Sequence, residues 1–346
     1  MKERILSHGL IIDSNARFIA DLIISSGIVT QLNIPGINSE IKKRTDFTGK
    51  YIIPGPILIS RHSNFNTNPP NEKFYPVSTT LVNLISDFKS IESEPPFKSD
   101  CLPVPFIDLL QIDDQVLTRL VFKDGHNMFF INHLNTEISL DKLRAIFQWL
   151  GEYGITLVIL NPDKSTLDYF LSALSVSSCK LLLVPNVERL KECILCTRKS
   201  KLLAHPVYLA CPCEALLSET SNIKLNGLDY SSDIFQIVSV DNKLLKKSNI
   251  ELIAVLWAQM VASGKMFFED FVDLLTIKPA RFFGLSSKGT LRPGYEADLI
   301  VIDPEKSSDW FGVNKKGHIP LILRGGEELN RNNGKWIRGS LPSLVI

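Results

Sequence analysis

The sequence lacks an excess of either charge and lacks any long apolar run. Its 346 residues include 38 Lys and Arg against 37 Asp and Glu, which gives a formal net charge of +1. Such a balance argues against a basic surface for nucleic acid. No apolar run approaches the roughly 20 residues that cross a bilayer, and no apolar stretch of about 7–15 residues precedes a small-residue cleavage site near the N-terminus. We therefore expect a cytoplasmic protein that binds neither nucleic acid nor a membrane.

The sequence also lacks the signature motifs of several enzyme classes. It contains no GxGxxG, no P-loop and no GxSxG, the motifs of dinucleotide-binding proteins, NTPases and many serine hydrolases. Without a secretory signal, its cysteines are expected to be reduced and buried. They are scattered through the chain, at Cys101, Cys179, Cys193, Cys196, Cys211 and Cys213.

Two cysteine pairs could indicate a zinc site. Cys193 and Cys196 form CxxC, and Cys211 and Cys213 form CxC a short distance further on. The first pair falls in the middle of a predicted helix, whereas a redox CxxC would need a helix N-terminus. The second pair falls at the far end of a predicted strand. We therefore interpret all four as buried structural thiols.

What the sequence does contain is a large apolar fraction arranged in two patterns. Hydrophobic residues make up 45% and charged residues 22%, as expected for a globular chain with a large core. Residues 4–53 are predicted to form short strands. Eight apolar runs then alternate with helical segments, at 51–59, 78–85, 104–110, 128–132, 155–160, 180–184, 206–210 and 235–240. Continuous apolar strands separated by helices indicate a parallel sheet buried on both faces.

The number of repeating units predicts an α/β fold of the (β/α)₈ TIM-barrel type. Two helices follow over 249–264 and 267–284, with Pro279 marking a break in the second. Strand-like sequence then returns. We expect a barrel over residues 54–286, and a small β-sandwich domain built from both termini, residues 1–53 plus 287–346.

Two segments carry a family resemblance. One runs from Lys278-Pro279-Ala280-Arg281 through Lys288-Gly289-Thr290-Leu291 and Pro293-Gly294-Tyr295-Glu296-Ala297-Asp298-Leu299; the other is Gly49-Lys50-Tyr51-Ile52-Ile53-Pro54-Gly55. Together they resemble the amidohydrolase superfamily, whose nearest branch is dihydroorotase and its cyclic-amidohydrolase relatives. The resemblance implies the barrel with its two-ended β domain, in keeping with the periodicity.

The same resemblance implies one or two divalent metals at the carboxyl-terminal mouth of the barrel. Active relatives hold them with an HxH pair, a carboxylated Lys, two further His and an Asp. Most of these are replaced here. The corresponding positions are Ser60 and His62 after strand one, Asn127 on strand four, Asn161 and Asp163 after strand five, Pro185-Asn186 after strand six, and Asp241 with Asn242 after strand eight. Asn64, also after strand one, stands where the relatives have a substrate-binding Arg.

His62 and Asp241 are the only ligand types retained at those positions, whereas a catalytic zinc site usually needs three protein ligands. We therefore expect no metal, a residual role for Asp241, and a ligand pocket drawn from His62, Asn64, Asn127, Asn161, Asp163 and Asn242. His205, which precedes strand seven at the opposite end of the barrel, is not expected to be a ligand.

Three functions remain open on these grounds. The first is a dihydroorotase-like protein that has lost catalysis and acts in assembly or regulation, with aspartate transcarbamoylase or another pyrimidine enzyme as partner, by analogy with inactive relatives. The second is a metal-dependent enzyme that hydrolyses a cyclic amide, with zinc or another divalent ion on His62 and Asp241. The third is a small-molecule binding protein. We also expect a homo-oligomer, because homodimers are common among the relatives.

Overall fold

Most of the chain is described by the computed structural model, in eleven segments. These are residues 3–13, 16–36, 44–61, 80–85, 100–131, 138–174, 177–217, 234–241, 252–310, 313–324 and 326–328. Among them, no helix is long and apolar enough to span a membrane.

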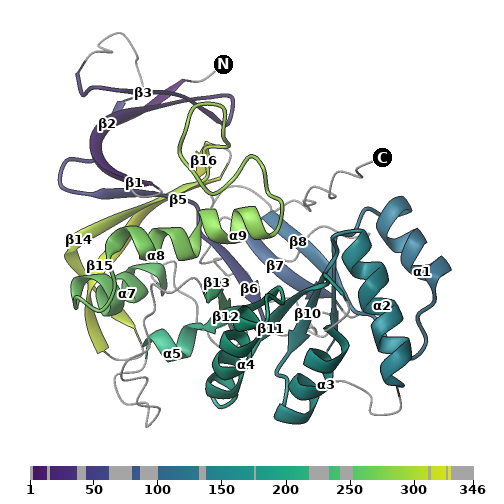
Figure 1. Cartoon of the computed structure of the whole chain (residues 1–346). Coiled ribbons are helices and arrows are strands. Elements are labelled where there is room, and N and C mark those ends of the chain that lie inside the picture. The colour runs from purple at the N-terminus through teal and green to yellow at the C-terminus, as the bar shows by residue number, and fades with distance from the viewer. Residues whose placement is uncertain are drawn as a thin grey trace.

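Eight strands of the described residues form one parallel sheet that curls into a barrel (Figure 1). In chain order they are β6 (Ile57–Ser60), β7 (Thr80–Ile85), β8 (Asp100–Pro105), β9 (Met128–Ile131), β10 (Thr156–Leu160), β11 (Lys180–Val184), β12 (Val207–Pro212) and β13 (Phe235–Val240). The first strand pairs with the last, β6 with β13. The ring closes between β8 and β9, where Phe106 bridges Phe130 and the Ile107 amide donates to the Phe130 carbonyl at 3.0 Å. The predicted (β/α)₈ barrel is confirmed.

Two of the predicted strands differ in their bounds by more than two residues. The third was expected over residues 104–110, but β8 ends at Pro105 because Asp108 starts a turn, accepting from the Leu110 amide at 2.9 Å through its side chain. The apolar run 51–59 divides between two sheets. Its first half is β5 (Tyr51–Pro54), outside the barrel, and its second half is β6.

Alternate residues of the barrel strands belong to two different cores, as the two-residue period of a strand requires. Inward-facing residues such as Ile57, Ile59, Phe130 and Val158 form a cluster inside the barrel. The intervening residues pack outward against the helices. The barrel interior is therefore filled with side chains, and chemistry is confined to its ends.

Helices cover the outside of the barrel and one of its ends (Figure 1). They are α1 (Asp114–Thr118), α2 (Leu140–Glu152), α3 (Lys164–Leu174), α4 (Leu190–Leu202), α5 (Cys213–Leu217), α7 (Leu252–Trp257), α8 (Phe268–Leu275) and α9 (Ile277–Phe282). Short π-helical segments extend α1 over Arg119–Lys123 and α7 over Ala258–Ala262.

Helix α9 closes the amino-terminal end of the barrel. Its Ala280 and the following Phe283 and Leu285 join the interior cluster. The predicted break at Pro279 lies three residues earlier, at Thr276, whose backbone leaves the helical region (φ −131°, ψ −81°). Pro279 instead occupies the first turn of α9, where its missing N–H is not needed.

Both termini contribute to a second, mixed sheet beside the barrel (Figure 1). Its hydrogen-bonded order is β16-β15-β14-β5-β1-β2-β3, with β4 paired to β1. The bounds are β1 (Arg4–Asp13), β2 (Ala16–Ser25), β3 (Ile28–Asn33), β4 (Arg44–Asp46), β14 (Leu299–Trp310), β15 (Val313–Arg324) and β16 (Glu327–Glu328). The two halves meet where Ile300 of β14 pairs with Ile53 of β5.

Candidate functional site at the barrel mouth

The mouth of the barrel is formed by the carboxyl ends of the eight strands. At β6 and β13, Ser60 pairs with Val240, and the Arg61 amide donates to the Val240 carbonyl at 3.1 Å. The next residue after each strand is charged, Arg61 after β6 and Asp241 after β13. Strand pairing therefore places an Arg and an Asp side by side at the mouth.

Arg61 is the centre of a charged cluster. Its side chain is only 5% exposed. Nη2 forms an ion pair with Glu214, the second residue of α5, and lies 3.7 Å from Oδ2 of Asp241. Nη1 donates to the Pro185 carbonyl at 3.4 Å. Groups that follow β11, β12 and β13 thus converge on a guanidinium that follows β6.

Two atoms of this cluster retain unused hydrogen-bonding capacity. Arg61 Nε and Glu214 Oε2 are buried and have no hydrogen-bond partner within the described part of the chain. Leaving such a group unpaired costs about 1–3 kcal/mol. A polar molecule bound at the mouth could satisfy a donor and an acceptor together.

The predicted site residues are only partly brought together at the mouth. Asp241 lies there, as expected. Asn161 follows β10 at the same end, with a positive φ of 47° and its amide donating to the Val184 carbonyl at 3.0 Å. His62, Asn64 and Asn242 lie outside the described residues.

Asp163 also follows β10, but its carboxylate caps helix α3. Oδ1 accepts from the Thr166 amide at 2.8 Å and from the Ser165 hydroxyl at 2.9 Å. The Thr166 amide, which favours the charged form, lowers the pKa of Asp163. Capping accounts for this carboxylate without a ligand.

Asn127 is far from the mouth, which corrects its placement as a counterpart of the strand-four lysine. It precedes Met128, the first residue of β9, and therefore lies at the amino-terminal end of the strand. Its Nδ2 donates to the Phe283 carbonyl at 3.4 Å, beside the residues that close that end. A four-residue strand cannot bring this side chain to the opposite end of the barrel.

The described part of the mouth does not fit the metal centre that the resemblance implies. Asp241 and Glu214, the carboxylates available there, already face the buried guanidinium of Arg61. Within the residues described, the acidic groups close enough to share an ion are Asp100, Glu296 and Asp298. They surround Lys288, whose Nζ lies 3.0 Å from Asp100 Oδ2, so a cation is already in place.

The two cysteine pairs lie on different elements, the first in the outer helix α4 and the second at the end of β12 and the start of α5. Cys193 and Cys196 lie in α4, and both are buried; Cys211 and Cys213 are buried as well. Burial raises the pKa of Cys193 to about 12 and that of Cys196 above the usual value.

Two residues of the cluster, Arg61 and Glu214, were absent from the predicted set. Each follows a strand closely in sequence: Arg61 comes directly after β6, and Glu214 comes two residues after β12. A charged residue just beyond an apolar strand is a usable signal in a barrel, because that position lies at the mouth.

Comparisons with known proteins agree with this geometry. The amidohydrolase family model matches residues 174–329. D-phenylhydantoinases of Escherichia coli, including that of O1:K1 / APEC, are 34% identical over 90 residues, covering 22% of this chain and 20% of the relative. The chain therefore matches about a fifth of the length of these curated relatives.

Solved structures match almost the whole chain at low identity. The dihydropyrimidinase from Brevibacillus agri NCHU1002 has a TM-score of 0.78 at 16% identity, covering 98% of this chain and 99% of that one. The L-hydantoinase (dihydropyrimidinase) from Arthrobacter aurescens has a TM-score of 0.76 at 14% identity, covering 99% and 98%. At these identities the likeness is one of fold. The resemblance to the amidohydrolase superfamily is confirmed: residues 174–329 match its family model, and the barrel has the fold of the hydantoinase structures.

Proposed function

We propose that the chain is a cyclic-amidohydrolase homologue that holds no catalytic metal at its barrel mouth and does not hydrolyse a cyclic amide. The observation that carries this proposal is the buried guanidinium of Arg61 between Asp241 and Glu214. Asp241 is the carboxylate that the resemblance assigns to the metal and to general-base catalysis. Here it faces a permanent cation supplied by the chain itself.

Electrostatics explain why the two cations exclude one another. Two unit charges 4 Å apart interact by about 4 kcal/mol at an effective dielectric constant near 20. A divalent ion at that distance from Arg61 would meet about twice that repulsion. It would also compete for carboxylates that the guanidinium already neutralises, and a guanidinium does not lose its proton in proteins.

A barrel of this kind retains two roles. The mouth can bind a polar molecule through the unused Arg61 Nε and Glu214 Oε2, and the outer surface can bind other proteins. Following the analogy with inactive relatives, the partner would be a pyrimidine enzyme such as aspartate transcarbamoylase, and the chain itself would form a homo-oligomer.

The direct test measures metal and turnover together. The purified chain is incubated with zinc or manganese, desalted and subjected to elemental analysis, then assayed with dihydroorotate, dihydrouracil and hydantoin. We expect well below one metal per chain and no turnover. Stoichiometric metal, together with turnover that Asp241→Ala abolishes, would overturn the proposal.

An Arg61→Gln variant tests whether the guanidinium is what prevents metal binding. Removing the guanidinium should increase zinc binding relative to the wild type, because Asp241 and Glu214 lose their counter-ion. Arg198→Gln, which removes an exposed arginine of α4, serves as the matched control and should leave zinc binding unchanged. Circular dichroism verifies that each variant is folded.

The second candidate is a hydrolase for a cyclic amide, with a metal on His62 and Asp241. The whole-chain match to hydantoinase structures favours it, as does the partial exposure of Asp241 at the mouth. It predicts hydantoin or dihydropyrimidine turnover that His62→Ala abolishes. For the assembly role, native mass spectrometry and co-purification from lysate test whether a pyrimidine enzyme accompanies the chain.

A further inference from the structure

A cavity lies at the end of the barrel opposite the mouth. Its volume is about 700 Å³, and it is lined by residues from the beginnings of β11, β12 and β13, the end of α4 and helix α9. The volume falls within the range of about 300–1,000 Å³ that is typical of small-molecule sites.

The lining of this cavity is basic. Lys180 comes from the start of β11, Lys201 from α4, and Lys278 and Arg281 from α9, while His205 precedes β12. None of the lining residues is acidic. Since the chain as a whole carries a net charge of only +1, these cations are concentrated locally.

Three of these cations have no fixed counter-ion. In the described part of the chain, the side chains of Lys180, Lys278 and Arg281 take part in none of the ion pairs. Asp273, on the preceding helix α8, interacts with Lys278 and Arg281 only through longer-range electrostatic attraction. Burial raises the pKa of Asp273, while the charges of Lys278 and Arg281 lower it.

One wall of the cavity is aromatic. Tyr208 and Phe282 both line it, with ring centroids 5.1 Å apart in an edge-to-face arrangement. Phe282 also packs against the barrel interior, so the wall is fixed to the core. A flat apolar group could lie against this wall while its charged end meets the cations.

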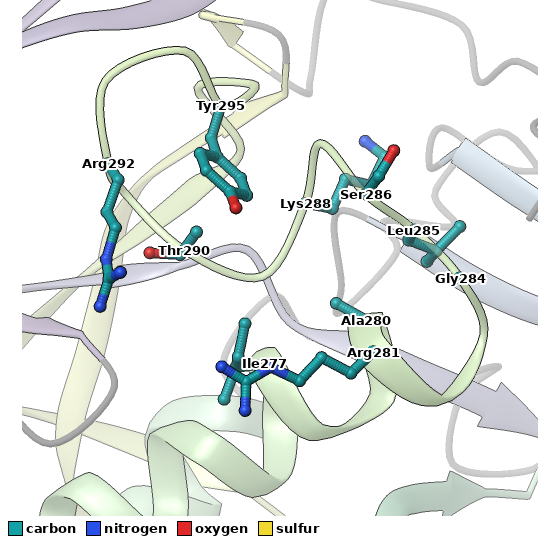
Figure 2. A pocket seen from close by; sticks show the side chains of 10 residues that line it. All are labelled: Ile277, Ala280, Arg281, Gly284, Leu285, Ser286, Lys288, Thr290, Arg292 and Tyr295. Atoms are coloured by element: carbon teal, nitrogen blue, oxygen red, sulfur yellow. The ribbon is translucent and has the colours of Figure 1, made fainter. Parts of the chain in front are cut away.

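Arg281 also lines a smaller adjoining hollow of about 240 Å³. Figure 2 shows Arg281 on helix α9 and Arg292, Thr290 and Tyr295 on the loop that passes over it. Arg292 is exposed and, like Arg281, has no ion pair among the described residues. Positive charge therefore continues beyond the larger cavity.

We propose that the cavity at the amino-terminal end of β11–β13 binds a small molecule that carries a phosphate or pyrophosphate group. Lys180, Lys278 and Arg281 would contact the anion, since Arg and Lys are the side chains that pair with phosphate oxygens. Tyr208 and Phe282 would contact a ring where the ligand has one. The site lies at the opposite end of the barrel from Arg61 and is independent of the proposal for the mouth.

Calorimetry with three probes tests this inference on the purified full chain at low salt. Inorganic pyrophosphate and AMP represent the free anion and a phosphorylated ring, and adenosine represents the ring alone. We expect at least one of the two anions to bind and adenosine to bind at least about tenfold more weakly than that anion. If AMP binds, Tyr208→Ala should weaken the binding of AMP without changing the binding of pyrophosphate.

Variants locate the site. Lys180→Gln combined with Arg281→Gln should weaken the binding of the anion by at least about tenfold, since about 1.4 kcal/mol corresponds to a factor of ten. Both residues are exposed, so folding should be retained. Arg198→Gln and Lys191→Gln together remove two exposed charges of α4 outside the cavity and should have little effect.

Three results would overturn the proposal. The first is the absence of binding by either anion at millimolar concentration. The second is equal weakening by the cavity and control variants, which would indicate a general effect of surface charge. The third is binding of adenosine as tight as that of AMP, which would show that the phosphate is not recognised.

Discussion

The Nζ atom of Lys288 lies 3.0 Å from Oδ2 of Asp100, although the two residues are 188 positions apart. Asp100 begins strand β8 of the barrel, and Lys288 follows helix α9 on the way to the second sheet. Nζ also contacts Glu296 at 2.7 Å and the carboxylate of Asp298. One buried ammonium thus joins the base of the barrel to the segment that leads into β14.

Lys288→Met should therefore destabilise the protein severely. Methionine fills a similar volume but leaves Asp100 and Asp298 buried without their cation, and removing one partner of a buried ion pair costs about 3–5 kcal/mol. Urea denaturation followed by circular dichroism measures the free energy of unfolding. Lys265→Met, at an exposed lysine, is the control and should change it by less than about 0.5 kcal/mol.

The contribution of Lys288 should not vary between pH 6 and pH 9. Burial lowers the pKa of Lys288, but the charges of Asp298, Asp100 and Glu296 outweigh burial and raise it above the usual value. A lysine whose pKa is raised on folding stabilises the fold at pH values below its pKa in the unfolded chain, about 10.4. This stabilisation is lost only as the pH rises through the pKa in the folded protein. A difference between wild type and Lys288→Met that falls with pH in this window would contradict the assignment.

Gly289→Ala and Gly294→Ala form a matched pair in the same loop. Both glycines have positive φ, 86° and 93°, so each substitution costs about 1–2 kcal/mol of backbone strain. A Cβ at Gly289 would lie 2.6 Å from Ala280 Cβ and 2.9 Å from the Thr276 carbonyl oxygen, whereas a Cβ at Gly294 meets nothing within 4 Å. Overpacking should add about 1–3 kcal/mol at Gly289 alone.

Thermal denaturation of the two glycine variants measures this difference. Gly289→Ala should have the lower melting temperature by several degrees, with Gly294→Ala between it and the wild type. Equal losses would show that the packing of the loop on α9 is less close than the distances indicate.

The barrel could be predicted from the sequence, whereas the ion pairs at its mouth could not. Apolar runs such as 155–160 and 180–184 identify strands because burial on both faces leaves few polar positions. The ion pairs of Arg61 depend instead on which strands adjoin and on where each one ends. The run 51–59 reads as one apolar strand, and only the pairing of Ile53 with Ile300 shows that it divides between two sheets.

Asn127 shows a second limit of sequence interpretation. The family motif locates this position only within a residue or two. In a strand of four residues, such an error moves a side chain from one end of the barrel toward the other. The sequence places Asp163 after β10, as the structure does. Its role in capping α3 is harder to predict, because the Thr166 amide is in position to donate to the carboxylate only once the helix has formed.

The pair Arg17–Glu269 should make stability depend on acid pH. Arg17 on β2 binds both carboxylate oxygens of Glu269 on α8, with Nη2 2.7 Å from Oε2. The hydrogen bonds from Arg17 lower the pKa of Glu269. A glutamate whose pKa is lowered on folding stabilises the fold at pH values above its pKa in the unfolded chain, about 4.3. This stabilisation is lost as the pH falls through the pKa in the folded protein.

Arg17→Gln should thus cost about 0.5–1 kcal/mol at pH 7, since the pair is partly exposed, and almost nothing below about pH 3. Urea denaturation of the wild type and the variant across this range measures the difference. Arg119→Gln is the control, because Arg119 lies 3.9 Å from Asp124 in an exposed pair on one surface turn. The Arg17 guanidinium also lies over the Phe268 ring, 5.8 Å from its centroid. A loss that is the same at both pH values would indicate lost packing on Phe268 rather than a charge effect.

The buried cysteines should be unreactive in the folded protein. Only the thiolate attacks a disulfide reagent. With the pKa of Cys193 raised to about 12, roughly one thiol in ten thousand is ionised at pH 8. Burial also raises the pKa values of Cys179, Cys211 and Cys213. Titration with Ellman's reagent should detect at most Cys101 within minutes in buffer, and all six cysteines in guanidinium chloride.

The same titration separates structural thiols from a zinc site, because a chelator would act only on the latter. Adding EDTA should change neither the melting temperature nor the number of reactive thiols. If EDTA lowered the melting temperature and exposed thiols of the two pairs, Cys193–Cys196 and Cys211–Cys213 would have to be zinc ligands. Their separation between an outer helix and the mouth end of β12 argues against this outcome, because four ligands of one zinc ion lie about 2.3 Å from the metal.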